Sequence, residues 1–354
     1  MKFNARLILF TSIALLLSSC GIAKKSEEEQ VFNEGVDTVC TVRAYHTCLD
    51  ADSYFLHEGD KVAVISPSSY PSEKQRDAVM NGLKELGYEP VEGSFAAGET
   101  RTVEDIASDL KWALESPEIK GIFCIRGGSA SSDVLDYMGL EPIKANPKLI
   151  IGYSDISTYL SAWTVTGNAS LHAMMSAAFT DLSEDCFEVQ KHMMQGEIPD
   201  YQCEGSPYDR QGTAEGILIG GNLSVLMTTL STGYDPFQIN EPYILFLEDT
   251  YEDMGHINRY LTVLKHMGVL DRAKGIIFGE WTGLSSVTNT NIGNSRGGEF
   301  VSVADMISRQ FLQDLDIPVA FGFPAGHGDN HYPLLFGRKA VLDVDKDSYT
   351  LKWN

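Results

Sequence analysis

The sequence predicts an α/β protein whose N-terminal domain holds a doubly wound parallel sheet of the Rossmann or flavodoxin kind, followed by a β-rich α/β domain. Short apolar runs alternate with amphipathic helical segments in the first half of the chain, as in parallel strands joined by helices. The last part of the chain is rich in strand-like runs. The 354 residues are enough for two domains with cores of their own, and the apolar fraction of 43% is ordinary for a globular protein.

The N-terminal domain is expected over residues 56–180 and opens with a buried strand. Residues 62–65 form a short continuous apolar run that leads into a turn. A helix is expected from about Ser72 to Leu86, and Gly87 is placed as its C-terminal stop.

The second helix of this domain is expected to begin after Thr102, because Asp105 stands three residues later, as in a capping box. The apolar residues that share one face of this helix are Ile106, Leu110, Ala113 and Leu114. Two further strands are expected over 121–125 and 148–153, with a helix from about Ser131 between them.

A polar stretch over residues 181–212 is predicted to be a linker, and the second domain is expected over 213–354. The motif over residues 214–222 marks its beginning, and its predicted elements are strands over 243–248 and 275–280, an amphipathic helix from about Ile257 to Met267, and a β-rich tail. Residues 285–298 are rich in Ser, Thr, Asn and Gly and are expected to form a loop.

The start of the chain predicts export and lipidation. Residues 1–19 combine a basic head with an apolar stretch too short to span a bilayer comfortably, as in a signal peptide. Cys20 ends a Leu-Ser-Ser-Cys motif that resembles a bacterial lipobox, and ordinary secretion with an unmodified Cys20 is the alternative. Residues 20–55 are expected to form a lipidated tether and an irregular extension.

A lipid anchor would hold the protein at the bacterial cell envelope. We expect it to face the periplasm from the outer membrane. Exposure at the cell surface stays open, because the acidic tether over residues 24–30 resembles a surface-export signal.

Charge and cysteine content exclude some functions. The net charge of −22 argues against binding to nucleic acid or to anionic lipid. Cys40 with Cys48 and Cys186 with Cys203 are candidate disulfides of an oxidising compartment, although spacing alone does not decide the pairing. Cys124 lies in an apolar run and is expected to be a buried free thiol. No Cys/His cluster has metal-ligand spacing.

Three residue types of an activated nucleophile stand at predicted strand ends. Ser154, Glu248 and His327 each follow or end an apolar run, and α/β proteins place reactive groups at such positions. In this hypothesis His327 takes the proton of Ser154 and Glu248 orients the imidazole. The backbone N–H groups of Gly128 and Asp155 are the candidate oxyanion donors. Gly152 is expected to allow the sharp turn into Ser154.

Each of these motifs also has a structural explanation. A Ser-Asp pair after a strand is typical of a helix N-cap, and Glu-Asp at a strand end is common in solvated loops. His331 is a nearby competitor for the role of His327. Arg126 and Ser129 are candidate substrate-binding residues, and a structural ion pair is the alternative for Arg126.

Six short motifs in one order resemble the LD-carboxypeptidase family of serine peptidases. They occupy residues 59–69, 126–128, 151–156, 220–224, 245–249 and 324–328, so the resemblance runs from about Gly59 to the C-terminus. It implies a Ser-Glu-His triad at Ser154, Glu248 and His327, completed between two domains, and usually a homodimer. Ile156 stands where an α/β-hydrolase has a glycine, which argues against that fold.

The resemblance implies a serine carboxypeptidase that needs no metal or organic cofactor and releases the terminal D-alanine of a murein stem tetrapeptide. Two departures from the family pattern put the substrate in question: residues 129–132 after Arg-Gly-Gly, which are closer to the microcin-peptidase branch, and residues 173–175. One alternative is the same mechanism acting on a microcin-like aminoacyl amide or peptide-nucleotide. The other is a solute-binding lipoprotein without enzymatic activity.

Overall fold

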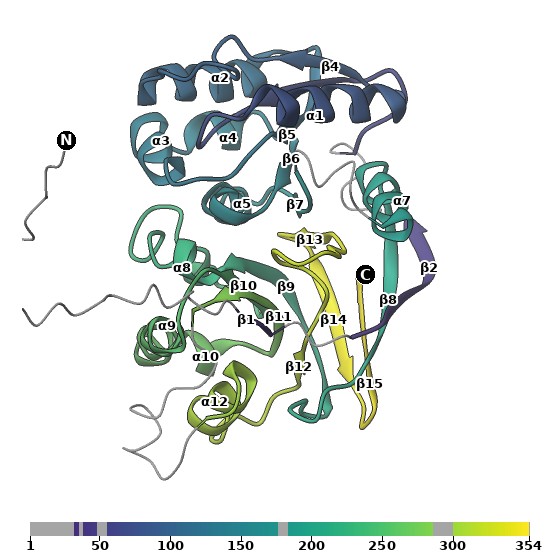
Figure 1. The fold of residues 1–354 in the computed structure, drawn as a ribbon, viewed down its shortest axis with the longest axis vertical. Helices are drawn as coiled ribbons and strands as arrows, with labels where there is room; N and C mark the ends of the chain where they lie inside the picture. Colours follow the sequence, from purple (N-terminus) through teal and green to yellow (C-terminus); the bar gives the residue numbers. More distant parts are fainter. Residues whose placement is uncertain (1–31, 35–37, 48–54, 176–182, 286–299, 354) are drawn as a thin grey trace, which may run out of the picture. The chain divides into compact units, whose positions relative to one another are not determined.

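The chain folds around two β-sheets. A computed structural model of the protein describes residues 32–34, 38–47, 55–175, 183–285 and 300–353 (Figure 1). Residues Val31–Asn354 form one compact unit, whose described strands build a sheet of six strands and a sheet of nine strands. The predicted fold class is confirmed, with a parallel sheet in the N-terminal part and a β-rich C-terminal part.

The first sheet contains five parallel strands and one antiparallel strand. In spatial order its strands are β4 (Glu89–Glu92), β3 (Lys61–Ile65), β5 (Ile119–Cys124), β6 (Leu149–Gly152), β7 (Ser170–His172) and β13 (Leu334–Phe336). Counted along the chain, the parallel strands follow the flavodoxin-like order 2-1-3-4-5. The connections therefore reverse direction between β3 and β5, and in such sheets ligands bind at the carboxyl ends of the strands beside this point.

Helices connect these strands as the sequence predicts (Figure 1). They are α1 (Glu73–Glu85), α2 (Val103–Glu115), α3 (Ser131–Met138), α4 (Glu141–Ala145), the 3₁₀ turn η2 (Ser154–Ile156) and α5 (Ser157–Val165). Ser72 caps α1, and Thr102 forms the expected capping box with Asp105 at the start of α2. Gly87 follows α1 with a φ of 86°, which explains why glycine ends this helix.

The second sheet is mixed. Its strands are, in spatial order, β1 (Phe32–Glu34), β11 (Gly275–Leu284), β10 (Tyr243–Thr250), β9 (Gly212–Asn222), β14 (Lys339–Val344), β15 (Ser348–Trp353), β8 (Glu197–Glu204) and β2 (Cys40–Thr47), with β12 (Val319–Phe321) beside β11. Strands β9 to β12 are parallel, so their carboxyl ends share one edge of the sheet.

The helices of the C-terminal part follow or flank these strands. They are α7 (Glu184–Met194), α8 (Leu223–Leu226), the 3₁₀ turn η3 (Pro236–Gln238), α9 (Met254–His266), α10 (Val269–Arg272) and α12 (Val303–Gln310). Helix α9 confirms the predicted amphipathic helix, since Ile257, Leu261 and Leu264 are buried. In the part of the chain that the structure describes, no helix has the length and apolar character required to cross a bilayer.

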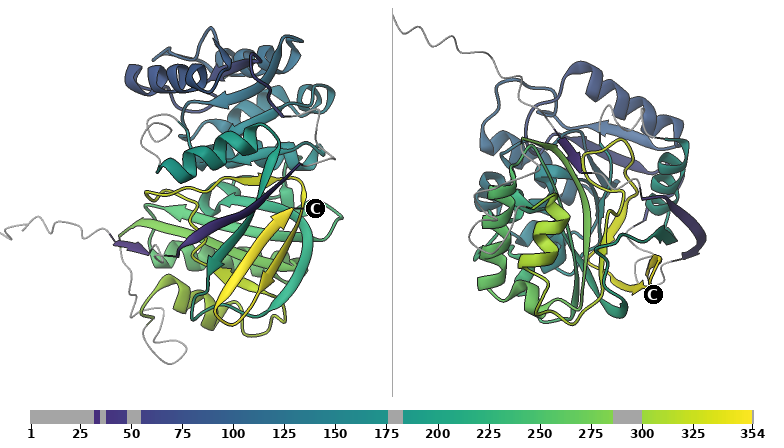
Figure 2. Two further views of the ribbon diagram at one scale, coloured as in Figure 1. Left: turned by 90° about the vertical axis from the view of Figure 1, so that its right-hand side faces the viewer. Right: turned by 60° about the horizontal axis from the view of Figure 1, so that its bottom comes forward.

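Two segments expected to be irregular are regular structure. Residues 40–47, predicted as an irregular extension, form the edge strand β2, which pairs with β8 (Figure 2). Residues 181–212, predicted as a linker, contain α7 and β8. Strand β2 escapes prediction because its residues after Cys40 are mostly exposed, so the apolar alternation of a half-buried strand is missing. Residues 1–31 and the predicted loop over 286–298 lie outside the described residues.

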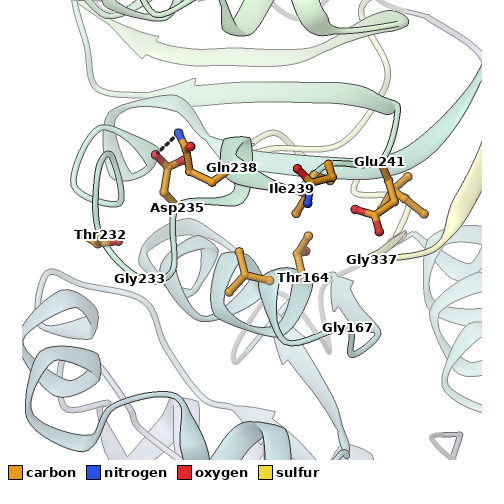
Figure 3. Close-up of a pocket in the computed structure, with 12 residues that line it drawn as sticks. Thr164, Gly167, Thr232, Gly233, Asp235, Gln238, Ile239, Glu241 and Gly337 are labelled. Atoms are coloured by element: carbon orange, nitrogen blue, oxygen red, sulfur yellow. Dashed lines mark hydrogen bonds between the residues drawn. The ribbon is translucent and has the colours of Figure 1, made fainter.

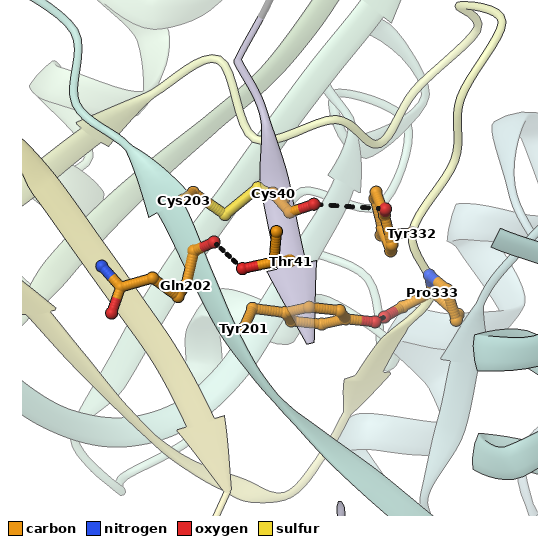
Figure 4. The surroundings of a disulfide bond; sticks show 7 residues. All are labelled: Cys40, Thr41, Tyr201, Gln202, Cys203, Tyr332 and Pro333. Carbon is orange, nitrogen blue, oxygen red and sulfur yellow. Dashed lines mark hydrogen bonds between the residues drawn. A yellow bond between two sulfur atoms is a disulfide. The ribbon is translucent and has the colours of Figure 1, made fainter. Parts of the chain in front are cut away.

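The disulfide joins Cys40 of β2 to Cys203 of β8, which are direct partners across the antiparallel pair (Figure 4). The two pairings considered from the sequence are therefore wrong. Cys186 is a buried free thiol, and Cys48 lies outside the described residues. Cys124 is a buried free thiol, as predicted. The disulfide closes a long loop, because its two cysteines are separated by 163 residues in sequence.

Removing this disulfide should destabilise the protein. Because a cross-link over a long loop restricts the unfolded chain strongly, the double variant Cys40→Ala/Cys203→Ala should lose about 2–5 kcal/mol in the free energy of unfolding. Urea unfolding of the variant, compared with wild type in the presence and absence of a reductant, checks this. Equal midpoints for oxidised wild type, reduced wild type and the double variant would contradict it.

Candidate active site

The carboxyl ends of the parallel strands of both sheets meet at one place. The end of β6 continues into Ser154 and the end of β7 is His172, while β9 ends at Asn222 and β10 contains Glu248. The backbone N–H of Asn222 donates to Ser157 Oγ at 3.0 Å, which ties the end of β9 to the start of α5. The predicted site residues therefore come from two sheet edges that contact each other.

Ser154 occupies a strained turn. Its φ is 62°, a left-handed value that non-glycine residues seldom adopt and that costs of the order of 1–3 kcal/mol. From the sequence, the sharp turn is expected at Gly152 instead. Gly152 is required for packing, because a Cβ there would lie 2.9 Å from atoms of Ile156 and Met175. The turn itself is made by Ser154, and such strained turns present a side chain at the end of a strand.

The Gly127-Gly128 loop after β5 lies directly against Ser154. A Cβ added at Gly127 would lie 3.0 Å from Ser154 Oγ and 3.3 Å from the backbone nitrogen of Asp155. Gly128 has a φ of 152°, and a Cβ there would lie 2.0 Å from Ser69 Oγ. Glycine at both positions thus allows three strand-end loops to approach each other closely.

The Asp155 carboxylate fixes this arrangement. It is buried and accepts hydrogen bonds from Ser68 Oγ at 2.5 Å and from the backbone N–H of Ser131 at 3.1 Å. The hydroxyl of Ser131 donates to the backbone oxygen of Asp155 at 2.9 Å. Asp155 therefore holds together the loops that follow β3, β5 and β6, and its own backbone is restrained beside Ser154.

Glu248 and His327 form a hydrogen-bonded pair, as expected for an oriented base. His327 Nδ1 lies 2.9 Å from Glu248 Oε2, and the Glu248 side chain is fully buried. The His327 ring packs on Tyr153, the residue before Ser154, with ring centroids 4.8 Å apart. Burial alone would raise the pKa of Glu248, but the neighbouring groups, first of all the facing His327, outweigh burial and lower the pKa to about 2. Burial would lower the pKa of His327, and the carboxylate of Glu248 raises it instead.

Glu280 is a second carboxylate beside His327. Its Oε2 accepts the backbone N–H of Gly328 at 2.8 Å. A Cβ at Gly328 would lie 2.4 Å from Glu280 Oε1, and one at Gly326 would lie 3.1 Å from Glu280 Cβ, so both glycines that flank His327 make room for this side chain. Burial raises the pKa of Glu280 to about 7.

The neighbouring carboxylate of Asp249 joins two strands by hydrogen bonds. It accepts hydrogen bonds from Asn222 Nδ2 at 2.9 Å and from the backbone N–H groups of Ser224 and Thr250 at 2.8 Å each. Burial, reinforced by the charge of Glu248, raises the pKa of Asp249 to about 7. Asp249 thus connects the ends of β9 and β10.

Two buried histidines lie behind Glu248. His172 Nε2 is 3.9 Å from Glu248 Oε1, and His172 Nδ1 is 3.1 Å from His331 Nε2. His331 Nδ1 donates to the backbone oxygen of Gly326 at 2.9 Å. His331, the competing candidate from the sequence, therefore contacts a second histidine and a carbonyl group, whereas His327 holds the hydrogen bond to Glu248.

Arg126 and Ser129 are at the margin of this arrangement. Both are exposed, and Arg126 Nη1 donates to the backbone oxygen of Tyr70 at 3.2 Å. Tyr70 lines a hollow of about 430 Å³ together with Arg76 and Glu99, and Arg126 is not among the residues that line it. The substrate-binding role of Arg126 and Ser129 stays a prediction.

Another cavity has a volume of about 390 Å³ (Figure 3). It is lined by Thr164 and Gly167 at the C-terminal end of α5, whereas Ser154 precedes the N-terminus of that helix, and by residues of the loop around Asp235. Ser154, Glu248 and His327 do not line it. Within the described part of the chain, no group of three or more His, Cys, Asp or Glu side chains is placed to hold a metal ion.

Sequence reasoning missed the supporting groups of this site. Glu280 is a lone charged residue in an apolar strand that runs parallel to the strand of Glu248, and this could have marked it as a second group at the same sheet edge. His172 ends a short strand, and nothing in the sequence relates it to His331, 159 residues away.

Comparison with known proteins identifies the family. The chain matches the LD-carboxypeptidase N-terminal domain over residues 62–173 and the LD-carboxypeptidase C-terminal domain over residues 215–342. The chain belongs to the LD-carboxypeptidase family.

Several known proteins of this family are similar to the chain over most of its length. A putative carboxypeptidase of Synechocystis is 30% identical over 300 residues (82% of this chain and 93% of that protein). A probable murein peptide carboxypeptidase of Bacillus subtilis is 29% identical over 305 residues (82% and 90%). The microcin C7 self-immunity protein of Escherichia coli is 24% identical over 333 residues (83% and 93%).

A solved structure shares the fold. The muramoyltetrapeptide carboxypeptidase of Oxalobacter formigenes superimposes with a TM-score of 0.72 at 25% identity, covering 83% of this chain and 98% of that chain. The family relationship supports a carboxypeptidase of the hydrolase class, and the names of the relatives include both murein peptides and microcin immunity.

Proposed function

We propose that this LD-carboxypeptidase removes the terminal D-alanine from a murein stem tetrapeptide, with Ser154 as nucleophile, His327 as general base and Glu248 as the group that orients the base. The observation that supports it most is the 2.9 Å hydrogen bond between His327 and Glu248 beside the strained turn of Ser154. The peptide bond cleaved joins the L-centre of a diamino acid to D-alanine.

The proposed reaction follows from the proton positions. The Glu248 carboxylate accepts the Nδ1–H of His327, so neutral His327 presents a bare Nε2. This nitrogen takes the proton of Ser154 while Oγ attacks the scissile carbonyl, and it returns the proton to the leaving amine of D-alanine. Water then attacks the acyl-enzyme by the same route and releases the shortened peptide.

The proposed oxyanion donors are the backbone N–H groups of Gly128 and Asp155. Asp155 lies in the first turn after β6, where backbone N–H groups have no partner within the helix. The loop of Gly127 and Gly128 is held against Ser154 by close packing on Ser69. Removing one such donor typically raises the barrier by about 3–4 kcal/mol.

Mass spectrometry of purified muropeptides tests this function. Incubation of tetrapeptide muropeptides with the protein should yield the tripeptide, with the loss of one alanine residue. A matched diastereomer with L-alanine at the terminus serves as the control. No mass change of the D-alanine substrate, at enzyme concentrations equal to the substrate, would contradict the proposal.

A second candidate is the same chemistry on an aminoacyl amide or peptide-nucleotide. Residues 129–132 favour it, because serine and alanine follow the Arg-Gly-Gly motif, and one relative is a microcin self-immunity protein. Parallel assays of tetrapeptide and aminoacyl sulfamoyl nucleotide would separate the two substrates. The solute-binding hypothesis has no support among the relatives named above.

We further propose that the protein is anchored to the envelope through a lipidated Cys20. The proposal rests on the signal-like residues 1–19 and the lipobox-like motif before Cys20. Incorporation of labelled palmitate into wild type but not into Cys20→Ser would support it, and equal labelling of both would refute it.

The pH dependence of the reaction should respond to Glu280. The base must be neutral, so kcat/KM should fall as the pH decreases through the raised pKa of His327. The carboxylate of Glu280 adds to that raised pKa when it is ionised, above its own pKa of about 7, so Glu280→Gln should move the acid limb of the pH profile to lower pH by about 0.5 unit. The glutamine oxygen can still accept the N–H of Gly328.

The matched control for Glu280 is Asp329→Asn, which removes an exposed charge of the loop that carries His327. Solvent screens this charge, so the acid limb should move by less than about 0.3 unit. An unchanged limb in Glu280→Gln, or a limb displaced to higher pH, would contradict the prediction.

A further inference from the structure

The buried pair His172 and His331 connects both ends of the His327–Glu248 pair. His172, at the end of β7, faces the carboxylate of Glu248, and His331 binds the carbonyl group of Gly326, the residue before His327. Both imidazoles are fully buried. The pair therefore links the first sheet to the loop that holds the proposed base.

The hydrogen bonds determine where the protons of this pair lie. A carbonyl oxygen can only accept, so His331 Nδ1 carries a proton for Gly326. The other nitrogen of neutral His331, Nε2, is then an acceptor. It lies 3.1 Å from His172 Nδ1, so that nitrogen must be the donor.

The remaining nitrogen of His172 is consequently bare in the neutral ring. His172 Nε2 and Glu248 Oε1 are 3.9 Å apart, and neither atom has a hydrogen-bond partner among the described residues. If Nε2 carried a proton, a charge-assisted hydrogen bond of about 2.7–2.9 Å would be expected. The longer distance fits two acceptors that face each other.

We propose that the His172–His331 pair positions and tunes the proposed catalytic base by keeping a bare ring nitrogen against Glu248. Oε1 of Glu248 is thereby left without a hydrogen-bond donor. The negative charge of the Glu248 carboxylate then acts on His327 through Oε2. His172 and His331 are positioning residues, and their role rests on the proposed function of His327. The backbone carbonyl of Gly326 determines which ring nitrogens of His331 and His172 carry a proton.

Other ionisable groups face this array. Glu248, Asp249 and Glu280 contribute negative charge around His327, and the Tyr153 phenol packs on it, with the pKa of Tyr153 raised by burial to about 12. Burial lowers the pKa of His172 and lowers that of His331 to about 3. His172 and His331 thus both lose their extra proton at a lower pH than His327 does.

Nitrogen NMR of the histidine side chains tests the proton positions without any substrate. The chain has eight histidines, so long-range ¹H–¹⁵N spectra of histidine-labelled protein are tractable. At pH 7.5, about 1 unit above the ordinary histidine pKa, His172 and His331 should each show a protonated Nδ1 and a bare Nε2. A protonated Nε2 on His172 would overturn the proposal.

Two variants of His331 separate tuning from simple packing. His331→Asn retains a donor for Gly326 but removes the acceptor of His172 Nδ1–H, so the His172 proton should move to Nε2 and bind Glu248. The pKa of His327, measured in the same spectra, should then fall by about 0.5–1 unit. His331→Gln places an amide oxygen near the former Nε2, so the proton of His172 should stay on Nδ1. The pKa of His327 should then stay within about 0.2 unit of the wild-type value.

Equal His327 pKa values in both variants would overturn the tuning role. If His331→Asn does not fold, the proton positions measured in the wild-type protein still test the proposal. The same spectra can be recorded on Ser154→Ala. These readouts need no turnover. If murein peptides are not cleaved while the spectra agree with expectation, only the proposed function is refuted.

Discussion

Replacing Ser154 by alanine should reduce kcat/KM for a tetrapeptide by at least about 10⁴-fold, because alanine has no hydroxyl group to supply the attacking oxygen of the acyl-enzyme. The fold should be retained. Ser154 is only partly buried, and the substitution removes a single oxygen atom. Release of D-alanine, measured with a coupled oxidase, gives the rate, and thermal unfolding checks the stability.

A matched control for this variant is Ser108→Ala, an exposed serine of α2 on the first domain. It should retain wild-type rates within about twofold, since exposed surface substitutions change stability by only about 0.5 kcal/mol. Activity of Ser154→Ala within tenfold of wild type would show that the nucleophile has been assigned wrongly.

Glu248→Gln should reduce kcat by about 10³–10⁴-fold at neutral pH. A carboxylate can only accept the Nδ1–H of His327, whereas an amide can donate to Nδ1 and stabilise the tautomer whose Nε2 carries the proton. That tautomer cannot take the proton of Ser154. Glutamine has nearly the same shape as glutamate, so packing around this fully buried position should persist.

The adjacent Asp249→Asn is the control for a buried carboxylate of the same strand. Burial raises the pKa of Asp249 to about 7, so a neutral side chain is already tolerated there. The loss of kcat in Asp249→Asn should be less than about tenfold. The carboxylate of Asp249 accepts hydrogen bonds from Asn222, Ser224 and Thr250 and not from His327. Equal losses in Glu248→Gln and Asp249→Asn would argue against a special role for Glu248.

The local features of the first domain could be predicted because their signals lie within a few residues. Thr102 and Asp105 mark a helix start, Gly87 marks a helix end, and the apolar run before Ser66 marks a buried strand. The hydrogen bond between Glu248 and His327 was expected from their positions at two strand ends, although the residues are 79 positions apart.

Features that depend on distant parts of the chain could not be predicted. The sequence contains no signal that pairs Cys40 with Cys203, because the pairing follows from the register of β2 against β8. Strand β13, from the C-terminal part, completes the first sheet beside β7, and no local pattern in the sequence indicates that these two strands pair. The sharp turn expected at Gly152, which has no Cβ to clash, is made by the left-handed backbone of Ser154, and no local pattern indicates a positive φ at a serine.

Trapping the acyl-enzyme tests the central claim most directly. A depsipeptide analogue of the stem tetrapeptide, ending in D-lactate, has a better leaving group, so acylation should become faster than hydrolysis of the acyl-enzyme. After an acid quench, peptide mapping should find the stem acyl group on Ser154, and Ser154→Ala should carry none. An adduct on a different side chain, or undiminished release of D-lactate by Ser154→Ala, would contradict the account.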